Sequence, residues 1–179
     1  ILMTKYIVFD RDGTLIKHIP YLFEANKVEL LPTVKKSLEL LKSNGFIFFL
    51  HTNQSGISRK YFNKSDVDTC NNKLLSLIGM GSNLFEEICI AEDYPANKIT
   101  YRKPSPKFGI EIMEKYKINK ENLFYVGDSL SDLETAQNIG CKCFGVNTGL
   151  IDLNIQNQQN LKFDISKSLY EVAIKIINS

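Results

Sequence analysis

Two carboxylates, Asp10 and Asp12, stand two positions apart directly behind the apolar run 6–9, where Gly13-Thr14 begins a turn. Acidic side chains that converge repel each other unless a cation or a shared proton lies between them. Such a pair suits a divalent metal ion and acid–base chemistry. The same residues also make an ordinary surface turn, because Asp and Gly are common turn formers. Residues 10–14 alone leave both interpretations open.

Three further polar clusters lie at 52–56 (Thr-Asn-Gln-Ser-Gly), 102–104 (Arg-Lys-Pro) and 127–132 (Gly-Asp-Ser-Leu-Ser-Asp). Each has a plain alternative: a polar loop, a solvated basic turn, or carboxylates that favour the positive end of a helix dipole. Together they offer carboxylates, a hydroxyl and cations. That set suits Mg²⁺, which prefers oxygen ligands, and a phosphate held by a hydroxyl, backbone N–H groups and a lysine.

The elements that must position these clusters alternate between strands and helices. Apolar runs predict strands at 6–9, 46–50, 85–91, 123–126 and 141–146, with a short edge strand at 163–165. Helical spacing predicts helices at 34–43, 64–77 and 168–177, a further helix that begins at 105–106, and another that ends at Gly140. The Gln- and Asn-rich stretch 154–160 is predicted to be a solvated loop. The fold class is therefore α/β with a central parallel sheet. The carboxyl ends of its strands share one edge, where we expect the four clusters to meet.

Two helix starts are predicted from capping residues. Ser105 is the expected N-cap of one helix, with Pro106 at its first position. Ser131 and Glu134 have the spacing of a capping box for the next helix.

Length and composition set limits on the class of protein. A chain of 179 residues fits one domain, 1–179, with 44% hydrophobic and 23% charged residues. The net charge of +2 is too small to argue for a nucleic-acid or membrane partner, and no apolar stretch approaches a membrane span. The first strand begins so early that we expect no signal peptide. Four cysteines without a C-x-x-C pair are expected to be reduced, in a cytoplasmic protein.

The four clusters resemble the four motifs of the haloacid dehalogenase (HAD) superfamily of phosphatases. The resemblance rests on 9–14 (FDRDGT), 52–57 (TNQSGI), 102–104 (RKP) and 127–132 (GDSLSD). It implies a three-layer Rossmann-like fold with a minimal cap. The spellings DRDGT, TNQSGI and RKP are similar to the subgroup containing heptose-bisphosphate 7-phosphatase and the histidinol-phosphatase domain. Tyr21 followed by Leu30-Leu31-Pro32 also resembles the substrate-facing loop of that subgroup.

One departure from the subgroup concerns zinc. The subgroup usually carries a zinc-binding loop of Cys-x-His and Cys-x-Cys just before its RKP motif. Here the stretch 89–101 has a single cysteine, Cys89, and no histidine. At least three ligands are missing, so we expect no zinc site there. The substrate and the way this loop is ordered stay open.

The resemblance implies a role for each acidic residue of the first motif. Asp10 would be the nucleophile that forms an aspartyl-phosphate, and Asp12 the general acid and base. Mg²⁺ would be held by Asp10, Asp128 and the main-chain carbonyl of Asp12, and would offset the repulsion between carboxylate and phosphate. Arg11 is expected to point away from its neighbours if the strand alternation continues, so it is assigned no catalytic role.

The remaining motif residues are expected to bind the phosphate and the rest of the substrate. Thr52 and Lys103 would bind the phosphoryl oxygens, and Asp132 would hold Lys103 or a metal-bound water in place. Arg102 would reach a second anionic group. The expected substrate-binding residues are Asn53, Gln54, Ser55, Arg102, His18 and Tyr21. For His18, an exposed loop position without contact to substrate is an equal alternative.

The leading hypothesis is a Mg²⁺-dependent phosphatase of a phosphorylated sugar, with D-glycero-D-manno-heptose 1,7-bisphosphate as the first candidate. Alternatives are a histidinol-phosphate phosphatase, a nucleic-acid 3′-phosphatase, and a non-catalytic phosphoryl-binding domain. The near-neutral charge argues against the nucleic-acid substrate. The expected partner is a small phosphorylated sugar, without membrane contact, for a monomer or weak oligomer.

Overall fold

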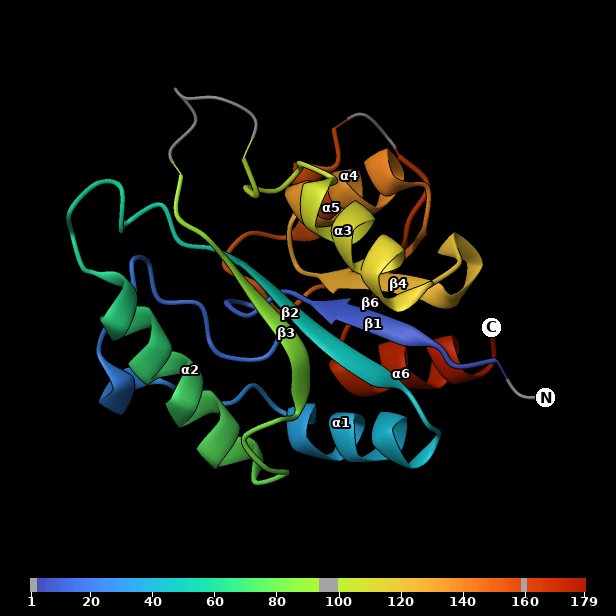
Figure 1. Ribbon diagram of the computed structural model, residues 1–179, viewed down its shortest axis with the longest axis horizontal. Coiled ribbons are helices and arrows are strands. Elements are labelled where there is room, and N and C mark those ends of the chain that lie inside the picture. Colours follow the sequence, from blue (N-terminus) through green and yellow to red (C-terminus); the bar gives the residue numbers. More distant parts are fainter. Residues whose placement is uncertain (1–2, 94–99, 159–160) are drawn as a thin grey trace.

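A computed structural model describes residues 3–93, 100–158 and 161–179. Its centre is a six-stranded parallel sheet in the order β3-β2-β1-β4-β5-β6 (Figure 1). The strands are β1 (Tyr6–Phe9), β2 (Ile47–Asn53), β3 (Phe85–Ala91), β4 (Leu123–Gly127), β5 (Lys142–Val146) and β6 (Asp164–Ser166). The predicted α/β class and parallel sheet are confirmed.

Helices cover both faces of the sheet, which makes three layers (Figure 1). The helices are α1 (Val34–Ser43), α2 (Lys64–Ile78), α3 (Lys107–Tyr116), α4 (Leu130–Ile139), α5 (Leu153–Gln156) and α6 (Leu169–Ile177), with 3₁₀ turns at Ala25–Lys27 and Lys120–Asn122. Buried side chains of α1, α2 and α6 form one core cluster with Phe9, Phe48 and Phe124 of the strands. Side chains of α3 and α4 form the other with Phe49 and Tyr125.

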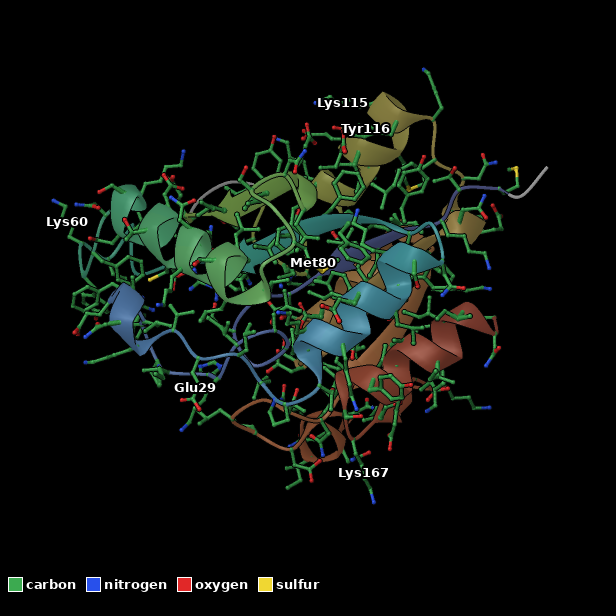
Figure 2. The ribbon with its side chains drawn as sticks, turned by 90° about the horizontal axis from the view of Figure 1, so that it is seen from below. Glu29, Lys60, Met80, Lys115, Tyr116 and Lys167 are labelled. Carbon is green, nitrogen blue, oxygen red and sulfur yellow. The ribbon has the colours of Figure 1, made fainter. Side chains whose placement is uncertain are left out.

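Several lysine side chains lie at the surface of these layers. Lys60, Lys115 and Lys167 point outward, whereas Met80 lies between the ends of two helices and packs partly buried against the core (Figure 2). The described residues contain no helix long and apolar enough to cross a membrane.

The register of the central strands aligns the end of β1 with residues of both neighbouring strands. Phe9, the last residue of β1, is aligned with Leu50 of β2 and Val126 of β4. The amide of Asp10 continues this pairing by donating to the carbonyl of Val126 at 2.9 Å. The residues that follow these strands therefore emerge side by side, as predicted for a parallel sheet.

Three local predictions need correction. The helix behind Ser105 starts one residue late, at Lys107, with Pro106 as N-cap. The capping box of α4 is Ser129 with Asp132, not Ser131 with Glu134. The predicted loop from 154 contains part of a short helix, α5, because Leu153 at its start is buried in the core.

The connection from β1 to α1 takes the place of the minimal cap that the motifs predicted. Within the described residues it holds isolated bridges and one 3₁₀ turn, and no separate cap domain is inserted there. Two aromatic pairs hold this connection against the loop after β2. Tyr21 packs edge-to-face on Tyr61, and Phe23 stacks on Phe62. The carboxyl edge of the sheet thus remains open between two loops.

Candidate active site

A buried ammonium group occupies the centre of the site. Nζ of Lys103 lies 2.7 Å from Oδ1 of Asp10 and 2.5 Å from Oδ1 of Asp132, and its side chain is 2% exposed. Burial alone would lower the pKa of Lys103, but the charges of Asp10 and Asp132 outweigh it and raise that pKa above its usual value. Lys103 is therefore a fixed positive charge directly beside the predicted nucleophile.

The three clustered carboxyl groups, Asp10, Asp128 and Asp132, disfavour one another's ionised forms. Burial and the charge of Asp10 raise the pKa of Asp128 to about 10, and the same causes raise the pKa of Asp132 to about 6. Burial also acts to raise the pKa of Asp10, but the charge of Lys103 outweighs it and lowers that pKa. Two like charges at this spacing favour the uptake of either a proton or a cation.

The donor set fits a hard divalent cation. Asp10, Asp128 and Asp132 each offer a carboxylate oxygen, and these atoms lie within 4.8 Å of one another. An all-oxygen set of this kind is what Mg²⁺ prefers. The side chain of Asp12 does not belong to the cluster, and of the three members Asp132 is already held by Lys103 and by its capping role.

Two glycines make room for the carboxylate of Asp128. Gly13 has a left-handed backbone (φ +85°), and a Cβ there would lie 2.7 Å from Cγ of Asp128. A Cβ at Gly149 would lie 2.8 Å from the same atom. Thr148 ties the two loops together by donating from Oγ1 to the carbonyl of Gly13 at 2.7 Å. The loop after β5 is therefore part of the site, although no sequence motif marked it.

Substituting Gly149→Ala is expected to weaken Mg²⁺ binding about tenfold, as for other changes behind metal ligands, because the new methyl group displaces the carboxylate of Asp128. Titration calorimetry with MgCl₂ measures this. Gly145→Ala is the matched control, since its Cβ would meet Leu153 instead, 2.7 Å from Cδ2. The control should lose stability without losing Mg²⁺ affinity. Unchanged Mg²⁺ affinity in the Gly149→Ala variant would contradict the assignment of Asp128 as a metal ligand.

Asp12 faces the cavity and is held from behind by several donors. The guanidinium of Arg11 donates to it twice, from Nε to Oδ2 at 3.0 Å and from Nη2 to Oδ1 at 3.1 Å. Nε2 of Gln54 donates to Oδ2 at 3.1 Å. The expectation that Arg11 points away from its neighbours is wrong. The chain leaves the strand at Asp10, and a turn in which the Arg11 carbonyl accepts from three amides ends the alternation.

Thr52 and Asn53, which were predicted to contact the phosphate and the substrate, form hydrogen bonds to other residues of the site. Thr52 is fully buried because β2 runs on to Asn53, and its hydroxyl contacts Gln54 at 2.8 Å and Asp12 at 3.4 Å. The amide side chain of Asn53 bonds both the N–H and the carbonyl of Lys103, at 3.0 and 3.3 Å. Thr52 and Asn53 thus hold Asp12 and Lys103 in place.

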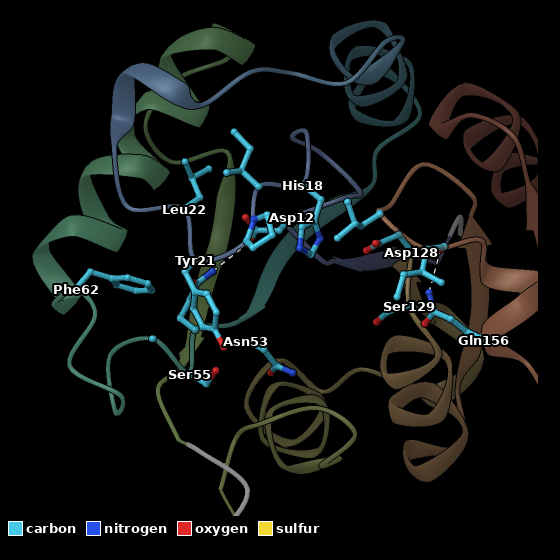
Figure 3. Close-up of a pocket in the computed structure, with 16 residues that line it drawn as sticks. Asp12, His18, Tyr21, Leu22, Asn53, Ser55, Phe62, Asp128, Ser129 and Gln156 are labelled. Carbon is cyan, nitrogen blue, oxygen red and sulfur yellow. Dashed lines mark hydrogen bonds between the residues drawn. The ribbon is translucent and has the colours of Figure 1, made fainter.

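A cavity of about 480 Å³ opens beside this cluster. Figure 3 shows Asp12 and His18 at its middle, Tyr21 and Phe62 on one side, and Asp128, Ser129 and Gln156 on the other. A smaller hollow of about 140 Å³ adjoins it and is lined by Asp10, Asp12, His18, Asn53, Lys103, Asp128, Ser129 and Ser131. A phosphate-sized recess therefore leads into a wider space for the rest of a substrate.

The structure places most of the predicted substrate residues in the wider cavity. His18, Tyr21, Asn53, Gln54 and Ser55 line its wall. Arg102 and Thr52 line neither space in the described part of the chain. Lining residues that the sequence motifs did not indicate include Phe62, Leu150, Ile151 and Gln156. The last three come from the segment after β5, and its position behind the fifth strand of a parallel sheet was the available signal.

The fold and the site define a three-layer α/β protein with a carboxylate–lysine centre at the carboxyl edge of its parallel sheet. The family model of the haloacid dehalogenase-like hydrolases matches residues 21–146, and the chain belongs to this family. The matched range contains three of the four motifs, and the carboxylates of the first motif lie just before it.

Two curated relatives differ in how much of their length is covered. The D-glycero-D-manno-heptose-1,7-bisphosphate 7-phosphatase of Chlorobaculum tepidum is 28% identical over 181 residues, covering 93% of this chain and 91% of that protein. The histidine biosynthesis bifunctional protein HisB of Legionella pneumophila is 32% identical over 141 residues, which are 77% of this chain. The chain spans only about 40% of the length of the HisB proteins that it matches.

Solved structures show the same architecture. The D,D-heptose 1,7-bisphosphate phosphatase of B. bronchiseptica, in complex with magnesium and phosphate, superimposes with a TM-score of 0.87 at 25% identity, covering 97% of this chain and 98% of that one. The corresponding phosphatase of Burkholderia thailandensis gives a TM-score of 0.70 at 21% identity, covering 98% and 99%. The three-layer fold expected from the motifs is confirmed.

Proposed function

We propose that this chain is a Mg²⁺-dependent phosphomonoesterase that works through an aspartyl-phosphate. The observation that carries the proposal is the Asp10–Lys103 contact of 2.7 Å beside two further buried carboxyl groups. An anionic nucleophile needs positive charge around it before it can approach a phosphate dianion. Here the charge comes from Lys103 and from the cation that the carboxylate cluster fits.

The first step would be attack by a carboxylate oxygen of Asp10 on phosphorus. The bond from phosphorus to the leaving oxygen breaks, and that oxygen takes the proton of Asp12. A water molecule then attacks phosphorus and gives its proton to Asp12, so that Asp10 is freed and inorganic phosphate forms. Asp12 suits both tasks because it lines the phosphate-sized recess as well as the wider cavity.

Binding and charge stabilisation fall to the groups around Asp10. Lys103 would donate to the phosphoryl oxygens, and Asp132 keeps its ammonium aimed at the recess by a 2.5 Å contact. Mg²⁺ on Asp10, Asp128 and the main-chain carbonyl of Asp12 would neutralise charge on the phosphoryl group. Thr52 would act on Asp12 through its hydroxyl, not on the phosphate, since it does not line the recess as Lys103 does.

The proposed substrate is a phosphorylated sugar, with D-glycero-D-manno-heptose 1,7-bisphosphate as the first candidate. Support comes from the relative and the solved structure of that activity, which match almost the whole chain. Asn53, Gln54, Ser55 and Gln156 offer the wider cavity amide and hydroxyl groups that suit sugar hydroxyls. In the wider cavity a second phosphate would contact His18, and it would contact Arg102 only if that side chain turned into the cavity.

Histidinol phosphate is the second candidate, because the HisB proteins are similar to this chain over 77% of its length. We further propose that residues 1–179 act as a single domain, since all six strands join one sheet. Four free thiols fit a cytoplasmic setting. The state would be a monomer or weak oligomer.

A substrate panel tests the proposal. Purified protein with MgCl₂ should release phosphate from heptose 1,7-bisphosphate faster than from histidinol phosphate, other sugar phosphates or a 3′-phosphorylated oligonucleotide. Chelation with EDTA should abolish release, and added Mg²⁺ should restore it. Fastest turnover of the oligonucleotide, with steep salt dependence, would refute the sugar substrate. Failure to release phosphate from any member, with any divalent metal, would instead favour a phosphoryl-binding domain.

A further inference from the structure

A buried arginine links the carboxylate of Asp12 to a helix that contributes nothing else to the site. The side chain of Arg11 is 0% exposed and forms two hydrogen bonds to Asp12, at 3.0 and 3.1 Å. Its third hydrogen bond runs from Nη1 to Oδ1 of Asn71 on α2, at 2.9 Å. A guanidinium is planar and rigid, so three bonds fix its plane and position.

Asn71 places a polar atom without a described partner in the interior, which lowers the stability of the fold. The residue is 4% exposed, and within the described residues its amide nitrogen Nδ2 has no hydrogen-bond partner. A buried donor without a partner lowers the stability of the folded chain. An apolar residue of similar size at this position would avoid that cost. The bond that its other atom, Oδ1, makes to Arg11 is the feature that such a replacement would remove.

We infer that Asn71 is a positioning residue that acts through Arg11 to aim the carboxylate of Asp12 at the leaving group. This inference rests on the proposed role of Asp12 as general acid and base. Asp12 is partly exposed at the cavity, so it has room to rotate once the guanidinium is no longer held. Small displacements of a proton donor have large effects on rate, and the donor matters most when the leaving oxygen is strongly basic.

The leaving group separates this role from a purely structural one. The alkoxide of a sugar phosphate must be protonated as it departs, whereas nitrophenolate departs without a proton. Misplacement of Asp12 therefore slows formation of the aspartyl-phosphate from the sugar phosphate but not from p-nitrophenyl phosphate. A contact that only held α2 against β1 would affect both substrates equally.

The test compares Asn71→Ala and the more space-filling Asn71→Leu with wild type and with Asn72→Ala, an exposed neighbour on the same helix. For both Asn71 variants we expect kcat/KM for a sugar phosphate to fall by about ten- to hundredfold. For p-nitrophenyl phosphate kcat/KM should stay within about threefold of wild type, and a burst of nitrophenolate should appear because the water step also needs Asp12. Asn72→Ala should match wild type.

Other outcomes overturn the inference. Equal losses on both substrates, or no loss on either, would mean that Asn71 does not act through Asp12. Thermal melting of each variant checks folding, and if neither Asn71 variant folds, the contact is a folding element and the inference fails. A wild-type protein that releases no phosphate at all would refute the proposed function instead.

Discussion

Replacing Asp10 by asparagine is expected to reduce phosphate release by about 10⁴-fold or more, because an amide cannot form the acyl-phosphate bond. The loss should appear in kcat for every substrate, since the nucleophile is common to all of them. The fold should survive, because Lys103 keeps its 2.5 Å contact to Asp132 when Asp10 becomes neutral. The measurement is steady-state phosphate release with saturating Mg²⁺, together with thermal melting.

Two controls make the Asp10→Asn result specific. Asp164→Asn removes a carboxylate that pairs with Lys175 at the exposed edge strand, and it should leave turnover unchanged. Asp10→Ala excludes activity that returns when asparagine slowly deamidates to aspartate. If the Asp10→Ala variant retained a tenth of wild-type turnover, Asp10 would not be the nucleophile.

Replacing Lys103 by methionine is expected to lower kcat by about 10²–10³-fold, the loss typical for one fixed donor to a charged transition state. The substitution keeps most of the side-chain volume but removes the only charge that pairs with both Asp10 and Asp132 among the described residues. Lys107→Met is the control, because its ammonium lies over the ring of Tyr101, outside the recess. Loss of less than fivefold in the Lys103→Met variant would contradict the assigned role.

The charge of Lys103 should also be insensitive to pH over the working range. Its pKa is raised in the folded chain, so its ion pairs stabilise the fold fully below the unfolded value of 10.5 and lose that contribution only as pH rises through the still higher folded value. The activity lost in the Lys103→Met variant should therefore be similar at pH 6 and pH 9.

Strand positions were the most predictable part of the fold. Apolar runs identified β1 and β3 with their bounds as the structure has them, although Glu86 and Glu87 interrupt the run of β3. Polar strand ends were harder: pairing of Thr52 and Asn53 with Ile90 and Ala91 extends β2 past the apolar run. Such pairing depends on a partner far along the chain, so local composition does not show it.

The site was predictable to the level of clusters but not of contacts. Parallel topology alone brings Asp10, Lys103 and Asp128 to one edge, and the structure places them together there. The sequence 129–134 has the spacing of two overlapping capping boxes, and only tertiary contacts choose between them. Asp132 is chosen because one of its oxygens caps α4 while the other holds Lys103. Arg11 was mispredicted because strand alternation does not continue through a turn.

The most direct test of the account is to find the phosphoryl group on the protein. Wild-type protein mixed with Mg²⁺ and a saturating sugar phosphate is quenched in acid within milliseconds, digested, and mapped by mass spectrometry. We predict a labile 80 Da addition (about one per chain when water attack limits turnover) on the peptide that contains Asp10 and none in the Asp10→Asn variant. Rapid phosphate release without any labelled peptide, or with the label on another residue, would contradict the account.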